Sequence, residues 1–347
     1  MKALSNVMVA AVYHGKGDLT IENIAPPEPP KGWATIKVDY CGICGTDLNI
    51  YGGGHPRAKG PLVMGHEFSG ETVNHPELPD GTRVTVRPIL SCGKCEACQS
   101  GYPHVCESLR LIGIDRDGAM AQYVVAPLDE ITPLPEGMST RKGSLVEPFA
   151  VGVHAIRESE FKPGDQVVVF GAGPIGICTA VSLQLLGARD VVVVEVHPYR
   201  QQVAEQLGFT VINPQEDSVS GKVKELFGGS LADIVFDCAA HPSVAEIIVD
   251  VAKVKGQIVL VGTYKKPTPL DLQNITFKEL SVKGTRVYTK TDYNIALDLL
   301  KRDFDFEKII THEVDLKEVQ KGIQNLIKGS AIKVLVSLKS KPKGEIQ

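Results

Sequence analysis

Residues 167–176 read VVVFGAGPIG, and this stretch decides the fold. The four apolar residues 167–170 predict a buried parallel strand. The turn that follows places glycines at positions 171, 173 and 176 in the pattern G-x-G-x-x-G. An apolar helical pattern then runs to Gly187, and a second buried strand, 191–194, ends in Glu195. Strand, glycine turn, helix, second strand and terminal acid together predict a dinucleotide-binding unit.

This pattern suits a dinucleotide for physical reasons. Small residues let the backbone approach a pyrophosphate, and the helix N-terminus supplies N–H donors and positive potential. Glu195 would accept hydrogen bonds from a ribose 2′-hydroxyl and would repel a 2′-phosphate, so NAD is favoured over NADP. The alternative for a glycine motif is a tight turn without a ligand. The predicted cofactor-binding residues are Gly171, Gly173, Pro174, Ile175, Gly176, Glu195 and Arg200.

The strand pattern on either side of this stretch indicates the domain organisation. Strands near 167–170, 191–194, 210–212, 233–237, 258–262 and 281–284 alternate with helices, and six strands fit a complete doubly wound parallel sheet. Upstream, short strand-like runs broken by glycine and proline turns predict a β-rich unit. Downstream, too few strands remain for a third domain. We therefore expect an α/β protein with a catalytic domain over 1–150, a dinucleotide-binding domain over 151–287, and a return segment over 288–347 that completes the first domain and ends in a solvated tail at 339–343.

Composition excludes several classes of protein. The chain has 347 residues, of which 43% are hydrophobic and 22% charged, as in ordinary globular enzymes. The net charge of −4 gives no indication of binding to nucleic acid or to an anionic membrane. No apolar run approaches the roughly 18 residues that a membrane span needs, and the first residues lack the pattern of a signal peptide. We expect a cytoplasmic protein without nucleic-acid or membrane partners.

Four cysteines in one short loop predict a structural metal site. Cys92, Cys95, Cys98 and Cys106 follow the spacing C-x2-C-x2-C-x7-C. Four thiolates at this spacing suit a closed tetrahedral zinc ion, which would order a loop too polar to fold by its own packing. An iron–sulfur cluster is the alternative, but the bacterial cluster run needs three residues before the last cysteine and a proline after it. Here the gap is seven residues and Glu107 follows, so zinc is favoured.

A second group of residues is a candidate catalytic metal site. Cys44, His66 and Glu67 offer a thiolate, an imidazole and a carboxylate, a good ligand set for Zn²⁺. These three would balance the metal charge and leave a coordination position open, as catalytic zinc sites do. From the residues alone, a buried cysteine beside a structural His–Glu pair is the alternative. Glu147, set among apolar residues, is a further candidate functional group, with a simple helix N-terminal acid as its alternative. His154 is predicted to be a structural helix residue.

With these residues in place, the chain resembles the zinc-dependent medium-chain dehydrogenase family over nearly its whole length. The resemblance rests on residues 42–47 (GICGTD), residues 65–67 (GHE), the four-cysteine loop, Glu147-Pro148 and the glycine turn, in the family's order. It implies a GroES-like β-rich catalytic domain and a Rossmann domain. It also implies one catalytic zinc, one structural zinc, NAD and a homotetramer.

Glu147-Pro148 is typical of the family's polyol branch, whereas dehydrogenases of the ethanol type have a cysteine there. The resemblance implies that Cys44, His66 and Glu67 bind zinc, with Glu147 binding directly or through water. Thr46 matches the hydroxyl that contacts the bound alcohol and begins a proton relay, so the candidate catalytic residues are Thr46 and Glu147. Many members have a histidine five residues after the ligand cysteine, whereas this chain has Asn49, so the outer relay must differ.

The resemblance implies hydride transfer from a secondary hydroxyl of a polyol or related sugar alcohol to NAD, with zinc as Lewis acid. Threonine, butanediol and sugar-acid (aldonate) dehydrogenases are the alternatives within the family. A nucleotide-binding sensor that has lost catalysis, or a zinc-free quinone reductase, is disfavoured by the retained metal ligands. Arg286 would suit a substrate carboxylate, with a surface salt bridge as its alternative. The candidates for the substrate pocket are Tyr51, Phe149, Arg286 and Tyr288.

Overall fold

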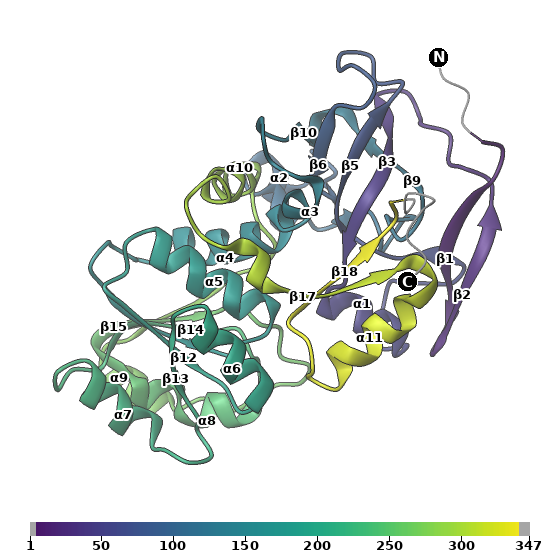
Figure 1. Cartoon of the computed structure of the whole chain (residues 1–347). Coiled ribbons are helices and arrows are strands. Elements are labelled where there is room, and N and C mark those ends of the chain that lie inside the picture. Colours follow the sequence, from purple (N-terminus) through teal and green to yellow (C-terminus); the bar gives the residue numbers. More distant parts are fainter. Residues whose placement is uncertain (1–4, 340–347) are drawn as a thin grey trace. The chain divides into compact units, whose positions relative to one another are not determined.

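The computed structural model describes residues 5–339, and its contacts divide the chain into two compact units (Figure 1). Unit 1 contains the described residues up to Glu147, together with 310–328 and the residues from 333 onward. Unit 2 contains 148–309 and 329–332. Residues 288–309, which the predicted return segment includes, fall in unit 2, and the chain re-enters unit 1 at Ile310. From residue 340 onward, the predicted tail lies outside the described residues.

Unit 2 is built on a six-stranded parallel sheet in the order β13-β12-β11-β14-β15-β16. This is the doubly wound order, in which the winding direction reverses between β11 and β14. The predicted Rossmann fold is therefore confirmed. The strands β11, β12 and β14 read as nearly continuous apolar runs because helices cover both faces of the sheet (Figure 1). The strands are β11 Gln166–Phe170, β12 Asp190–Val194, β13 Thr210–Ile212, β14 Ala232–Asp237, β15 Ala252–Leu260 and β16 Ser281–Gly284.

Most helices of unit 2 begin where the sequence places proline or a capping side chain. Pro174, Pro198 and Pro242 each occupy the first turn of a helix, where the missing N–H has no partner to lose. The helices are α4 Val146–Glu158, which begins at the boundary of unit 1, α5 Pro174–Leu185, α6 Pro198–Gln206, α7 Val219–Leu226, α8 Pro242–Val251, α9 Leu272–Phe277 and α10 Lys290–Leu299, followed by the 3₁₀ turn η3 Phe306–Ile309.

Unit 1 is rich in β-structure, as predicted. Its largest sheet has the order β10-β6-β5-β3-β18-β17, with β9 also paired to β3, and β2-β1-β4 and β7-β8 form two smaller sheets. Its strands are β1 Met8–Gly15, β2 Asp18–Ile24, β3 Trp33–Gly42, β4 Leu62–Val63, β5 Glu67–Val73, β6 Arg83–Val86, β7 Ile89–Leu90, β8 Arg110–Leu111, β9 Tyr123–Pro127, β10 Ile131–Pro133, β17 Ile310–Asp315 and β18 Lys333–Ser337. Its helical elements are α1 Gly45–Tyr51, α2 Glu96–Gln99, α3 Thr140–Gly143 and α11 Val319–Ile327, with 3₁₀ turns η1 Pro103–Val105, η2 Leu128–Glu130 and η4 Leu316–Glu318.

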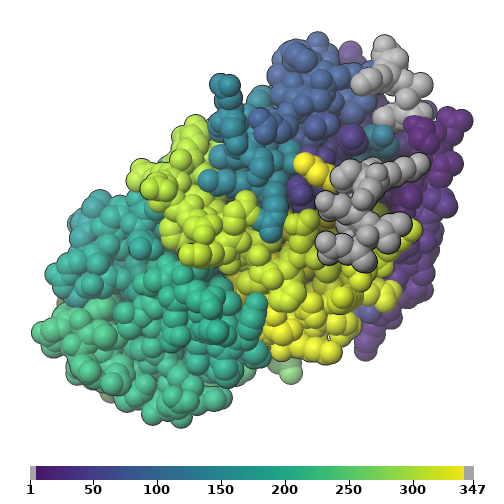
Figure 2. Space-filling model, viewed as in Figure 1, coloured from purple at the N-terminus to yellow at the C-terminus, as the bar shows by residue number. Residues whose placement is uncertain are grey.

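The return segment of unit 1 matters most for the site. β18 pairs antiparallel with β3, with Val336 opposite Cys41, so the last described strand lies beside the strand that leads into α1. α11 buries Val319, Ile323 and Leu326, one side of the helix, and its outer face lies within the yellow surface of Figure 2. None of the helices in the described part of the chain combines the length and apolarity that a membrane span requires.

Candidate metal centres and cofactor site

The structure brings Cys44, His66 and Glu67 together at the ends of two paired strands. β3 runs antiparallel to β5 with Gly42 opposite Glu67, so the residues after β3 lie beside the start of β5. Cys44 is the N-cap of α1, and His66 immediately precedes β5. One ligand atom from each of the three residues lies within 4.8 Å of the others. His66 is 4% exposed and Glu67 is fully buried.

The polar atoms of this group fit a bound cation. In the part of the chain that the structure describes, His66 Nδ1, Glu67 Oε1 and Asp47 Oδ1 are buried without a hydrogen-bond partner. Each such atom costs about 1–3 kcal/mol when its full desolvation is left uncompensated. A cation held by sulfur, nitrogen and oxygen ligands offsets that cost, and this donor set suits Zn²⁺. The residues therefore fit a zinc ion.

Asp47, which we did not single out from the sequence, lies beside the histidine. Its Oδ2 accepts a hydrogen bond from the Cys44 backbone N–H at 2.9 Å, and its Oδ1 lies 3.7 Å from His66 Nδ1. At 3.7 Å these two atoms are too far apart for a hydrogen bond, so the carboxylate acts on the ring through its charge. Burial alone would lower the pKa of His66, but the negative groups Asp47, Cys44 and Glu147 raise it well above its usual value. The same field favours a metal cation. An acid three residues after the N-cap was the available sequence signal.

Lys333 is a second participant that the sequence did not reveal. It is 1% exposed, and its Nζ forms an ion pair with Glu67 Oε2. Lys333 begins β18, which pairs with β3, so strand pairing brings it to the start of β5. Glu67 thus directs one carboxylate oxygen to a lysine and leaves the other, Oε1, without a partner among residues 5–339.

The two candidate catalytic residues lie close to this group. Thr46 is half-buried in α1, and its Oγ1 lies 3.8 Å from Cys44 Sγ. Glu147 is buried in the first turn of α4. It is not one of the three residues whose ligand atoms lie within 4.8 Å, although its charge contributes to raising the pKa of His66. Direct binding of zinc by Glu147 remains a prediction.

The four-cysteine loop forms a compact cluster of sulfur atoms. One ligand atom from each of Cys92, Cys95, Cys98 and Cys106 lies within 4.8 Å of the others, and all four are free thiols. Cys92 Sγ lies 4.0 Å from Cys98 Sγ, and Cys95 Sγ lies 3.8 Å from Cys106 Sγ. Backbone N–H groups of Lys94 and Cys95 donate to Cys92 and lower its pKa to about 6. The loop fits a structural zinc ion held by four thiolates.

The glycine turn of unit 2 has the geometry of a dinucleotide site. α5 begins at Pro174 with Gly173 as its N-cap, so its first N–H groups face the turn. A Cβ atom on Gly176 would lie 1.8 Å from the carbonyl oxygen of Gly171, so only glycine fits there. Such close packing allows the backbone to approach a pyrophosphate at the helix N-terminus.

Glu195 and Arg200 lie at the same turn. Glu195 Oε2 accepts a hydrogen bond from Ala172 N–H at 2.7 Å, and Oε1 accepts from the N–H groups of Val196 and His197. A Cβ atom on Gly173 would lie 4.0 Å from Arg200 Nη1. Arg200 Nε is buried and, within residues 5–339, has no hydrogen-bond partner. The predicted cofactor residues are therefore gathered in one place, although their contacts with a cofactor remain predictions.

Comparison with known proteins identifies the family. Residues 30–136 match the family described as "Alcohol dehydrogenase GroES-like domain", and residues 174–302 match "Zinc-binding dehydrogenase". A sorbitol dehydrogenase of Halalkalibacterium halodurans is 34% identical over 346 residues, which cover 97% of this chain and 99% of the relative. The chain belongs to the zinc-dependent medium-chain dehydrogenases. It is therefore an oxidoreductase that acts on CH–OH groups of a small hydroxy compound.

Two further similar proteins are a galactonate-type dehydrogenase and a solved structure with a bound cofactor. The 2-dehydro-3-deoxy-L-galactonate 5-dehydrogenase of Pseudoalteromonas atlantica is 32% identical over 325 residues, covering 92% of this chain and 95% of the relative. The crystal structure of a zinc-binding dehydrogenase from Sinorhizobium meliloti 1021 bound to NADP superimposes with a TM-score of 0.90. It is 29% identical, and the match covers 96% of this chain and 100% of that chain.

Two of the aromatic residues that we expected in the substrate pocket of the dehydrogenase are core residues, and that expectation is wrong. Phe149 is fully buried and packs edge-on against Phe306 with ring centroids 5.5 Å apart. Tyr288 is also fully buried, and its ring stacks on the ring of Tyr293 with centroids 5.9 Å apart. An apolar aromatic residue beside a motif looks the same in sequence whether it lines a pocket or fills a core. Tyr51, which is half-buried, and the exposed Arg286 remain candidates.

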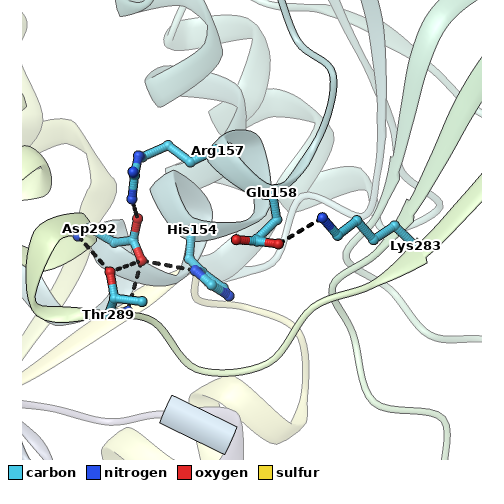
Figure 3. Close-up of polar contacts among 6 residues, drawn as sticks. All are labelled: His154, Arg157, Glu158, Lys283, Thr289 and Asp292. Atoms are coloured by element: carbon cyan, nitrogen blue, oxygen red, sulfur yellow. Dashed lines mark hydrogen bonds and ion pairs between the residues drawn. The ribbon is translucent and has the colours of Figure 1, made fainter. Parts of the chain in front are cut away.

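His154 has a structural role in unit 2. Figure 3 shows it beside Asp292, with His154 Nδ1 at 2.8 Å from Asp292 Oδ2. Thr289 Oγ1 donates to the same oxygen at 2.6 Å, and Arg157 donates to the other oxygen, Oδ1. The network joins α4 to the N-terminus of α10. Burial alone would raise the pKa of Asp292, but these hydrogen bonds hold it well below its usual range.

Replacing Asp292 with asparagine should therefore destabilise the dehydrogenase by about 2–4 kcal/mol at neutral pH, because the Arg157 guanidinium and the other donors lose a buried charged acceptor. The lowered pKa means that the charge contributes stability above the carboxyl's unfolded pKa of about 3.9, and that this contribution is lost as pH falls below it. The difference between wild type and variant should thus shrink below about pH 4. Urea unfolding at a series of pH values measures it.

Asp298→Asn is the matched control on the same helix. The Asp298 side chain is 69% exposed and pairs with Lys301, so its loss should change stability by less than about 1 kcal/mol. Equal losses in the two variants, or a loss at Asp292 that does not depend on pH, would contradict the assignment.

Proposed function

We propose that this dehydrogenase oxidises a secondary hydroxyl of a polyol or related sugar alcohol with NAD. The observation that carries the proposal is the group Cys44, His66 and Glu67, a three-residue ligand set of the kind that leaves a zinc coordination position open for substrate. Glu147-Pro148 supports the polyol branch, and the sorbitol dehydrogenase relative is consistent with it.

The metal, the cofactor and the chain's own residues would each have a separate role in the reaction. Zinc, when bound, supplies Lewis-acid activation of the substrate hydroxyl, and the nicotinamide accepts the hydride. The alcohol loses a hydride to NAD and a proton to the protein, so that a ketone, NADH and a proton are formed. Thr46 Oγ1, which lies 3.8 Å from Cys44 Sγ, would accept the substrate hydroxyl proton as it passes its own proton to the next member of a relay. Asn49 cannot act as a base, so we infer an outer relay through Glu147 and water.

We propose NAD rather than NADP as the cofactor. Glu195 places a carboxylate at the glycine turn, where it would bind ribose hydroxyls and repel a 2′-phosphate. The Sinorhizobium meliloti relative bound to NADP indicates that family membership alone does not decide this preference.

Sugar-acid oxidation is the second candidate function. It is favoured by the galactonate-type relative and by the exposed Arg286, whose guanidinium could form paired hydrogen bonds with a carboxylate. Butanediol and threonine remain further candidates within the family. We also propose a cytoplasmic homo-oligomer, with a tetramer expected, and light scattering of the purified protein tests the tetramer.

The testing experiment is NADH formation across a panel of polyols, diols, threonine and aldonic acids, with and without a chelator. We expect chelator-sensitive turnover of a polyol, and NADP should support at most a small fraction of the rate. Turnover confined to aldonic acids would replace the polyol assignment with the second candidate. Absence of turnover on every compound, in protein that holds zinc and binds NADH, would favour a sensor.

A further inference from the structure

Asp237 is the point at which two loops of unit 2 are joined. It ends β14 and is fully buried. Its Oδ1 accepts hydrogen bonds from the N–H groups of Ala239 and Ala240 at 3.0 and 2.9 Å. Its backbone carbonyl accepts from the N–H groups of Val261 and Gly262 in the loop after β15, at 2.9 and 2.8 Å. One residue therefore fixes the loop that follows its own strand and the loop that follows the next strand.

Tyr264 supplies the remaining contact. Its hydroxyl donates to Asp237 Oδ2 at 2.7 Å, so both carboxylate oxygens are engaged. Burial and the nearby Asp237 raise the pKa of Tyr264, so the phenol stays protonated and acts as the donor. Tyr264 is half-buried and lies in the second loop. Its side chain thus ties that loop back to the end of β14.

The two loops are packed tightly and partly strained. Ala240 has a φ of +48°, a left-handed conformation that costs a non-glycine residue about 1–2 kcal/mol. A Cβ atom on Gly262 would lie 2.7 Å from Ala240 Cβ, so the loops are in direct contact. The hydrogen bond from Ala240 N–H to Asp237 helps to hold this conformation. Loss of the tyrosine hydroxyl would leave a buried carboxylate oxygen without its donor and weaken the hold on both loops.

These loops lie where the nicotinamide half of a dinucleotide would extend. A doubly wound sheet binds its ligand at the carboxyl ends of the strands, across the point between β11 and β14. Glu195 follows β12, where the adenosine would bind, and the glycine turn follows β11, where the pyrophosphate would bind. The other half of the ligand must then lie over the ends of β14 and β15. The loops that Asp237 and Tyr264 join begin at those ends.

We propose that Tyr264 is a positioning residue that acts through Asp237 to hold residues 238–240 and 261–263 in the conformation that receives the nicotinamide half of NAD. This inference rests on the proposed use of NAD. The proposal predicts an effect on the binding of one half of the dinucleotide only. Loss of the tyrosine hydroxyl should weaken the binding of ligands that include the nicotinamide half and should not change the affinity for ligands that stop at the pyrophosphate.

Tyr264→Phe tests the proposal, because it removes one hydroxyl and keeps the ring. We expect the Kd of NADH, measured by the fluorescence of the reduced nicotinamide, to rise about tenfold, as loss of one hydrogen bond to a charged group implies. The Kd of ADP, which ends at the pyrophosphate, is measured by calorimetry and should stay within about twofold of wild type, a difference too small to reflect a lost hydrogen bond. Tyr102→Phe is the control, because Tyr102 is an exposed residue of unit 1 and its substitution should change neither constant.

Unchanged NADH affinity in Tyr264→Phe would overturn the proposal. Equal weakening of NADH and ADP binding would also overturn it, because that result indicates a general disturbance of unit 2. Wild-type protein that binds neither compound would instead refute the proposed NAD-dependent function itself, so the two failures are distinguishable.

Discussion

Replacing Cys44 with serine should abolish turnover while NADH binding remains. Cys44 contributes one of three ligand atoms within 4.8 Å, and an alcohol oxygen is a much poorer ligand for Zn²⁺ than a thiolate. Loss of Lewis-acid activation removes about 4 kcal/mol or more of transition-state stabilisation, roughly a thousandfold in kcat/KM. The glycine turn lies in unit 2, whereas Cys44 lies in unit 1, so NADH affinity should not change.

Three measurements make this result specific. Steady-state kinetics give kcat/KM, metal analysis should show zinc falling from two ions per chain to one, as the two ligand clusters imply, and NADH fluorescence reports cofactor binding. Cys41→Ser is the matched control. Cys41 is buried three residues earlier in β3, outside the ligand group, and its thiol points to the Gly42 carbonyl. The control should keep two zinc ions and its activity, whereas full activity in Cys44→Ser would refute the metal assignment.

The parts of the fold that could be predicted from the sequence depend on local signals. A buried parallel strand must be a continuous apolar run, so residues 167–170 and 191–194 identify β11 and β12 almost to the residue. The glycine turn can be recognised in the sequence because only glycine fits at position 176. The four-cysteine loop is equally local, since its ligands lie within 15 residues of chain. The physical requirement behind each of these features involves only residues that are close together in the sequence.

What could not be predicted depends on pairing across the chain. Lys333 and Glu67 are 266 residues apart, and nothing near Lys333 distinguishes it from a lysine at the exposed start of a strand. Only the pairing of β18 with β3 places it in the metal centre. The boundary of the return segment also depends on pairing across the chain. The contacts of Asp292 with its partners on α4 decide that α10 packs with unit 2. Helical periodicity predicts that α10 exists but not its neighbours.

Lys333→Met should destabilise zinc-free protein far more than zinc-loaded protein. Lys333 and Glu67 are each 1% exposed at the side chain, so methionine keeps much of the packing but leaves the Glu67 carboxylate buried without its cation. Removing one partner of a buried ion pair costs about 3–5 kcal/mol. A zinc ion at the Cys44, His66 and Glu67 group would supply the missing positive charge, so the loaded protein should lose much less. The zinc-dependent rise in unfolding temperature should therefore be larger in the variant than in wild type.

Thermal unfolding of wild type and variant, each with zinc and after chelation, measures the effect, which should amount to about 6 °C or more between the two forms at roughly 2–4 °C per kcal/mol. Chelation also empties the four-cysteine loop, but that contribution is common to wild type and variant and cancels in the comparison. The double variant Lys333→Met/Glu67→Gln provides the control, because it removes both charges and should recover much of the stability lost by the zinc-free single variant. An equal loss in zinc-loaded and zinc-free protein would mean that Lys333 contributes packing alone. A smaller loss in the zinc-free form would mean that Glu67 does not face the metal. Either result would separate the lysine from the metal centre, whereas the expected result makes Glu67 the residue through which β18 and the zinc ion act on one another.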